Sequence, residues 1–165
     1  MLEEIKRLES SQEFRERIKK NPDIFLAHVF YIIDEENKGI VQAGYYSKKK
    51  DIILTFIVEK EKISFNCEDR VFKEQKTAIK PLDLSKVKID VNEALEIADA
   101  LQKEKYKAQL PVKKIAILQH LPAGQVWNIT FLTQSFKTLN IKIDSETREI
   151  VSDKLVSIIS QDSTS

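Results

Sequence analysis

The feature that most constrains this fold is a run of alternating apolar and polar residues near the end of the chain, residues 124–151. It reads GQVWNITFLTQSFKTLNIKIDSETREIV, three short runs rich in β-branched and aromatic residues separated by turn residues. Such alternation is typical of strands with one buried face, because successive side chains of a strand point to opposite faces. Trp127, Ile129 and Phe131 then share one face, and the residues between them share the other. The segment predicts an antiparallel, up-and-down sheet.

The first half of the chain contains the same pattern in residues 23–59. Three β-rich runs are separated there by two polar turns, and the first turn contains Gly39, which can adopt a positive φ. One or two further short strands are expected before residue 76. Each set of strands follows a segment in which apolar residues recur at helical spacing, residues 2–20 and residues 91–106.

Capping signals mark where these helices begin. In the first segment Ser10 and Glu13 have the spacing of a capping box, so the helix is expected to restart there. Asp90 and Glu93 have the same spacing immediately before the apolar stripe of the second helix. Residues 77–90 contain a proline and little periodicity, and we interpret them as a connector.

The second half resembles the PepSY domain family over about residues 84–156. The resemblance rests on the helix VNEALEIADA, the strand VKKIAIL, the segment GQVWNITFL with its Trp127, and the closing run TLNIKIDSETREIV. It implies a helix packed on an antiparallel sheet. It also implies a protein-binding role, because PepSY-like domains are associated with peptidase propeptides and are thought to restrain proteases. Most such domains lie outside the cytoplasm.

The order of elements predicts an α+β fold of two helix-plus-antiparallel-sheet units, PepSY-like or cystatin-like in shape. A shift without gaps that places Gly39 on Gly124 also aligns the turns and strands of the two halves, which indicates an internal duplication. The alternative is that two antiparallel meanders resemble each other in any case. The expected units are residues 1–76 and 91–158, joined by the connector 77–90 and followed by a disordered tail at 159–165.

Composition argues against several partners. Lys and Arg number 27 against 26 Asp and Glu, whereas nucleic-acid binders usually carry a clear basic excess. No run approaches the roughly 20 apolar residues that a membrane-spanning helix needs. The first residues lack the pattern of a signal peptide, so we expect a cytoplasmic protein, or an extracytoplasmic one if the chain is a trimmed form.

Residues with catalytic or metal-binding potential do not form a recognisable motif. Cys67 is the single cysteine, and His28 and His120 would need a third ligand to hold a metal. The carboxylates at 34–36 and the basic, aromatic run at 45–50 both lie at expected turns, where charged side chains are usually solvated. We therefore predict no catalytic residues, no metal site and no cofactor.

The preferred hypothesis is a non-enzymatic protein-interaction module, with peptidase inhibition or regulation as the version that the PepSY resemblance implies. Its partner is another protein of unknown identity, and pairing with a second copy through exposed sheet edges is an open alternative. A second hypothesis is a carrier of small apolar ligands, with a pocket between helix and sheet. The residues expected to line that pocket are Trp127, Phe131, Tyr45 and Tyr46.

Overall fold

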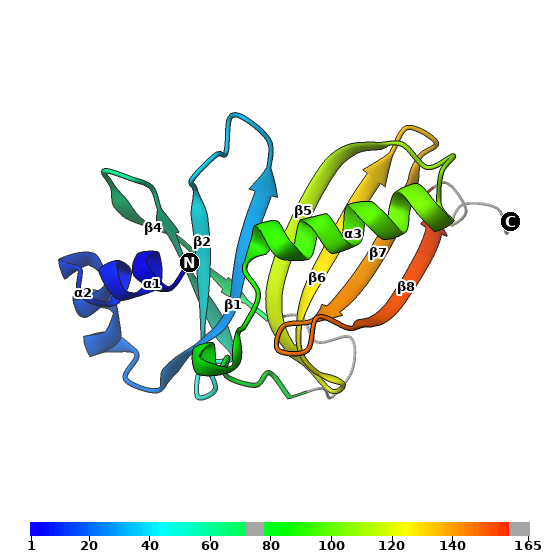
Figure 1. Cartoon of the computed structure of the whole chain (residues 1–165). Helices are drawn as coiled ribbons and strands as arrows, with labels where there is room; N and C mark the ends of the chain where they lie inside the picture. The colour runs from blue at the N-terminus through cyan, green and yellow to red at the C-terminus, as the bar shows by residue number, and fades with distance from the viewer. Residues whose placement is uncertain (72–77, 159–165) are drawn as a thin grey trace, which may run out of the picture.

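The computed structural model describes residues 1–71 and 78–158, and its main element is an antiparallel sheet (Figure 1). Eight strands form this sheet, each paired only with antiparallel neighbours. They are β1 (Ile24–Ile33), β2 (Val41–Ser47), β3 (Ile52–Val58), β4 (Ile63–Arg70), β5 (Pro111–Leu121), β6 (Gly124–Thr133), β7 (Lys137–Asp144) and β8 (Ile150–Ser157). An antiparallel sheet was expected and is present.

Helices precede each half of the sheet. Two short helices, α1 (Leu2–Glu9) and α2 (Gln12–Lys20), lie before β1. A 3-10 turn η1 (Leu84–Lys86) and a longer helix α3 (Val91–Lys105) lie before β5. The helix restart between α1 and α2 was expected at Ser10, but the N-cap is the next residue.

The caps explain where α2 and α3 begin. The Ser11 hydroxyl accepts a hydrogen bond from the backbone N–H of Phe14, which satisfies one of the free donors at the start of α2. At α3 the Asp90 carboxylate accepts from the backbone N–H of Asn92 and of Glu93. The Glu93 side chain accepts in turn from the Asp90 backbone N–H, so the predicted capping box is confirmed.

The strand order is β4-β3-β2-β1-β5-β6-β7-β8, so the two halves of the chain meet at β1 and β5. These two strands pair over six residues, with Phe30 opposite Ile117 and Val29 opposite Leu118. The sheet therefore continues from one half into the other without a break.

The expected pair of separate helix-plus-sheet units, with an internal duplication, is wrong. Pairing between β1 and β5 joins all eight strands in one sheet, so neither half has a sheet of its own. The helices also differ, because α1 and α2 have 8 and 9 residues whereas α3 is a single helix of 15. The pattern within each half predicts its strands correctly, but it carries no information about which strands pair between the halves.

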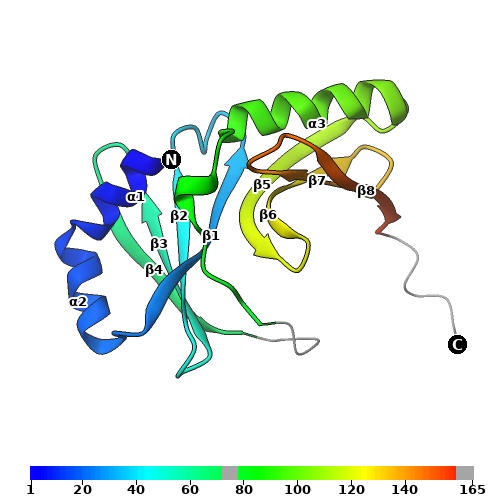
Figure 2. The ribbon, with the colours of Figure 1, turned by 60° about the horizontal axis from the view of Figure 1, so that its bottom comes forward.

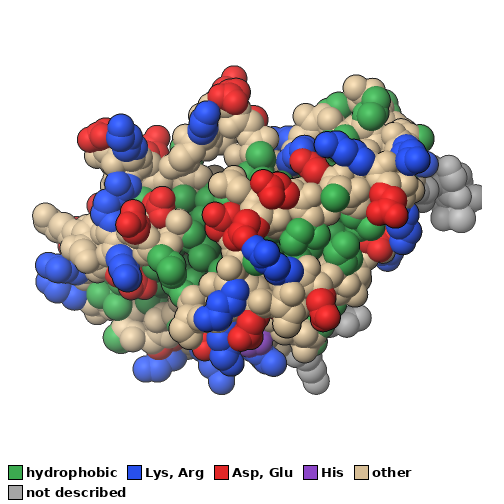
Figure 3. All heavy atoms as spheres, in the orientation of Figure 1, with side chains coloured by type: hydrophobic (Ala, Val, Ile, Leu, Met, Phe, Trp, Pro, Cys, Tyr) green, Lys and Arg blue, Asp and Glu red, His purple; other side chains and the backbone are tan. Residues whose placement is uncertain are grey.

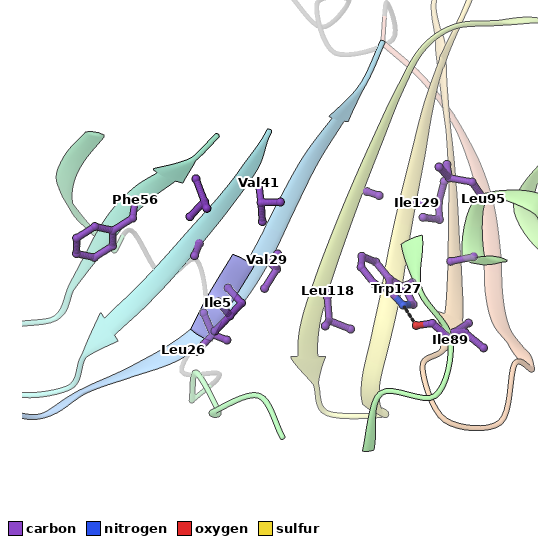
Figure 4. Close-up of a cluster of buried hydrophobic side chains, with 14 of the residues drawn as sticks. Ile5, Leu26, Val29, Val41, Phe56, Ile89, Leu95, Leu118, Trp127 and Ile129 are labelled. Atoms are coloured by element: carbon purple, nitrogen blue, oxygen red, sulfur yellow. Dashed lines mark hydrogen bonds between the residues drawn. The ribbon is translucent and has the colours of Figure 1, made fainter. Parts of the chain in front are cut away.

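One continuous core lies under the helices. Buried residues from both halves belong to the same cluster, which contains Val29, Phe56, Leu118 and Trp127 (Figure 4). Trp127 is fully buried, and its indole N–H donates a hydrogen bond of 3.1 Å to the carbonyl of Ile89 in the connector. A buried indole N–H needs such a partner, because an unpaired donor in the core is costly.

The alternation that was predicted for residues 124–132 is confirmed. Trp127, Ile129 and Phe131 are all 0% exposed, whereas the residues between them are half-buried on the other side of β6. Gly39 adopts the positive φ expected of its turn, +77°. The predicted tail at 159–165 lies outside the part of the chain that the structure describes.

Candidate functional site

All three helices lie on the same side of the sheet. Figure 2 shows α1 and α2 beside β3 and β4, and α3 over the strands of the second half. Phe14 of α2 packs against Phe56 and Tyr45, with ring centroids 5.4 and 4.8 Å away. Ala94 and Ala98 of α3 are fully buried in the same core. We call the opposite side of the sheet the open face, because no helix of the described chain packs on it.

The centre of the open face contains no Lys, Arg, Asp or Glu side chain. One row runs across β3, β2, β1, β5 and β6, and a parallel row flanks it on each side. Gly44 and Val126 in the flanking row of His28 are buried. The other members are half-buried, and they are Thr55, Ile57, Gln42, His28, Phe30, Ile32, Gln119, Ile117, Ile115, Asn128 and Thr130. In a chain with 32% charged residues, an uncharged strip across five strands is a clear departure from the rest of the surface. Figure 3 shows, by contrast, acidic and basic side chains interspersed over the helix-covered side.

Polar groups of the open face are held in place by one another. The Asn140 side-chain amide donates to the Asn128 carbonyl oxygen at 2.6 Å and lies 3.0 Å from the Thr130 hydroxyl. Lys142 and Lys154 extend two of these rows on β7 and β8, and Lys113 lies two residues before Ile115 on β5, so charge returns around the centre of the face. The arrangement is an apolar and amide centre with a charged rim.

His28 contributes to the neutrality of this face. Its ring lies directly on Gly44 of β2, where a Cβ atom would be only 2.1 Å from the imidazole Cε1. Burial lowers the pKa of His28 below its usual value of 6.5. The ring is therefore uncharged at neutral pH, and Gly44 is the residue that makes room for it.

The residues expected to line a ligand pocket are divided between the two sides of the sheet. Trp127 and Phe131 of β6 and Tyr45 of β2 are buried in the core under the helices. Tyr46 points to the opposite side, where its ring lies 5.6 Å from that of Phe25. The structure brings Trp127 and Phe131 together on one strand but does not gather all four around one space, and their ligand-binding role stays a prediction.

The other candidate residues are also separated. His28 lies on the open face, whereas His120 lies on the helix-covered side with Nδ1 3.1 Å from the Pro81 carbonyl. The Cys67 thiol donates to Asp69, and this hydrogen bond together with burial raises the pKa of Cys67. Over residues 1–71 and 78–158, no three His, Cys, Asp or Glu side chains are grouped to hold a metal ion.

Sequence reasoning did not single out the open face. Phe30 and Ile117 belong to β-rich runs that look buried on both sides, and only their pairing places them at the centre of an uncovered surface. The usable signal was the absence of any charged residue in β1 (Ile24–Ile33).

Comparison with solved structures shows one similar fold. It is the crystal structure of a "putative lipoprotein" from Clostridium difficile 630, with a TM-score of 0.56 and 14% sequence identity. The match covers 86% of this chain and 88% of the other, more than either half of this chain, so the similarity includes both halves. No model of a known protein family matches the chain, and no curated protein matches it in sequence. Within the described ranges, none of the helices is long and apolar enough to cross a membrane.

Proposed function

We propose that this chain is a non-enzymatic protein-binding module, and that its partner packs on the open face. The observation that carries the proposal is the uncharged centre of that face, built around Phe30, Ile32, Ile115 and Ile117. The buried centres of protein interfaces are depleted of charged residues, because each charge taken from water needs a partner.

The energetics of this face favour a macromolecular partner. Apolar surface that leaves water contributes about 25 cal/mol per Å² of area buried, and the face offers aliphatic and aromatic side chains from several strands. Amide and hydroxyl groups such as Gln42 and Thr55 can pair with a partner's backbone, which gives orientation without the cost of burying a charge. A sheet or helix with an apolar face is the complementary shape.

A more specific form of this proposal is that the partner is a peptidase, which the chain binds and restrains. It rests on the PepSY resemblance of residues 84–156 and needs the partner to be a peptidase or its propeptide. The description of the structural neighbour as a lipoprotein supports a location outside the cytoplasm, as an alternative to the cytoplasmic prediction. Fractionation of the native cells, with detection of the full-length chain, distinguishes the two locations.

A matched pair of charge insertions tests the proposal. Gln42→Lys places a positive charge in the central row of the open face, and Ala100→Lys places the same charge on the exposed side of α3. The wild type and both variants serve as bait for proteins from native extract, after circular dichroism has shown that all three are folded.

The expected result is a stoichiometric partner that is retained by the wild type and by Ala100→Lys and is lost with Gln42→Lys. Equal recovery on all three baits would mean that the partner binds elsewhere, and recovery of no protein would count against the module. Peptidase activity in the captured material, inhibited by the wild type and not by Gln42→Lys, would support the peptidase version.

A further inference from the structure

A cleft with a volume of about 700 Å³ lies on the helix-covered side of the molecule. It forms where the first turn of α1, the hairpin between β1 and β2, and the start of α3 meet, and Figure 3 shows the surface hollowed beneath that hairpin. Clefts of about 300–1,000 Å³ that combine apolar walls with a few polar groups are typical small-molecule sites.

The floor of the cleft is aromatic and rigid. Tyr31 lines it, and the Tyr31 ring packs on Trp127 with centroids 6.0 Å apart. Trp127 is itself fixed by full burial and by its hydrogen bond to the carbonyl of Ile89. Val41, which is 3% exposed, and Val91 complete an apolar surface around the ring.

The hydroxyl of Tyr31 has no hydrogen-bond partner within residues 1–71 and 78–158. The other three tyrosines each donate to a carboxylate. Burial, followed by the negative charges of Glu4 and Asp90, raises the pKa of Tyr31, and both acids line the same cleft. Tyr31 and the two acids thus line the same cleft.

The charges in the cleft leave a negative excess. Glu4 Oε2 lies 2.6 Å from the amino group of Met1, and Lys38 lies 3.9 Å from Glu35. Lys114 is held by Asp99 on α3, at 2.7 and 2.8 Å from its two carboxylate oxygens. With these pairs formed, the remaining charge of the cleft comes from two further carboxylates, Asp34 and Asp90.

One carboxylate oxygen of Asp90 takes no part in the helix cap. Its Oδ1 accepts both capping hydrogen bonds of α3, from Asn92 and Glu93, so a ligand can contact Oδ2 without breaking the cap. An ammonium group beside an aromatic ring gains from the ring's negative face as well as from the carboxylate. The geometry therefore suits a ligand that carries an ammonium group on an apolar body.

We propose that this cleft binds a small organic amine, with the ammonium beside Asp90 and the Tyr31 hydroxyl, and the apolar body on Tyr31, Val41 and Val91. The cleft lining shares only Ile32 with the open face, so the site does not depend on the proposed protein-binding function.

The test compares two probes with the same body and opposite charge, 2-phenylethylamine and 3-phenylpropanoate. Trp127 is the single tryptophan and packs under Tyr31, so its fluorescence reports occupation of the cleft. Two-dimensional NMR of the same samples locates the perturbed residues. We expect saturable binding of the amine and none of the anion.

Two variants separate specific from nonspecific binding. Asp90→Asn removes the charge and retains the cap, because Asn is an equally good N-cap residue, and it should weaken amine binding by about tenfold. Glu104→Gln removes one negative charge from an exposed position in the C-terminal part of α3, outside the cleft lining, and affinity should stay within about twofold. The proposal is overturned if the anion binds as well as the amine, if Asp90→Asn binds like the wild type, or if no saturation occurs below about 10 mM.

Discussion

His28 and Gly44 form a contact in which each residue restricts the other. The imidazole occupies the position that a side chain at 44 would need, so only glycine fits there while the ring keeps its place. Nothing local in the sequence marks Gly44 as special, because its partner lies on the neighbouring strand. By contrast, Gly39 was recognisable as a turn residue from its immediate neighbours, and its φ of +77° confirms this.

Substituting these two glycines should therefore destabilise the protein for different reasons. Gly44→Ala overpacks the open face, and we expect a loss of about 1–3 kcal/mol in the free energy of unfolding. Gly39→Ala meets no atom within 4 Å, so its loss of about 1–2 kcal/mol comes from the left-handed backbone alone. Urea denaturation measures both. Adding His28→Ala should reduce the destabilisation caused by Gly44→Ala and leave that caused by Gly39→Ala unchanged. If His28→Ala does not reduce the effect of Gly44→Ala, the contact between His28 and Gly44 is contradicted.

The buried His28 ring also predicts a pH dependence. Its pKa is lowered in the folded state, so the unfolded chain binds a proton more readily. The contribution to stability is complete above the unfolded value of about 6.5 and is lost as the pH falls from there toward the folded pKa, with a slope of up to about 1.4 kcal/mol per pH unit. Urea titrations at pH 7.5, 6.5 and 5.5 should show this loss in the wild type and a smaller one in His28→Gln. The same slope in both proteins would rule out His28 as the source.

At the scale of elements, local chemistry predicted most boundaries to within one or two residues. The capping box at α3 was read correctly because all of its donors and acceptors lie within four consecutive residues. The restart of the first helix was misplaced by one residue, since Ser10 and Ser11 offer the same hydroxyl and only the backbone conformation selects Ser11. One or two further short strands were expected after residue 59, and the described residues contain one there, β4, which runs from Ile63 to Arg70 with a register shift opposite Thr55 and Phe56.

The cap of α3 can be tested separately from the charge at the same position. Asp90→Ala removes the acceptor for two backbone N–H groups and should cost about 1 kcal/mol of stability. Asp90→Asn retains the acceptor and should lie within a few tenths of the wild type. Thermal unfolding followed by circular dichroism compares the three proteins. Equal destabilisation by both substitutions would indicate that the charge, rather than the cap, matters for α3.

At the scale of the molecule, the sequence did not reveal that the halves share a sheet. Pairing between β1 and β5 depends on residues from opposite halves of the chain, such as Phe30 and Ile117, and leaves no periodic signal in either. The set of residues on the open face also depends on this pairing, so the sequence did not reveal it either. The similar fold of the Clostridium difficile protein, at 14% identity, shows that the arrangement does not require this particular sequence.

Because the two halves share one core, a destabilising core substitution in one half should destabilise the other half as well. Leu54 of β3 is fully buried in the first half, and Leu54→Ala should cost about 2–5 kcal/mol. Trp127 fluorescence reports the second half, and circular dichroism reports the whole sheet. We expect both unfolding midpoints to shift by the same amount in urea. A fluorescence midpoint that stays at the wild-type value would show that the halves unfold independently.

The central position of β1 has a consequence for biosynthesis. The first four strands leave the ribosome well before β5, and the roughly 90 residues between the ends of β1 and β5 take about 5–20 s to translate. During that interval the inner edge of β1 has no neighbour, although in the finished protein this edge is paired with β5. A nascent chain is thus most exposed to pairing with another nascent chain at the strand that later becomes inaccessible, and holdase chaperones acting in this window should raise the yield of the native protein.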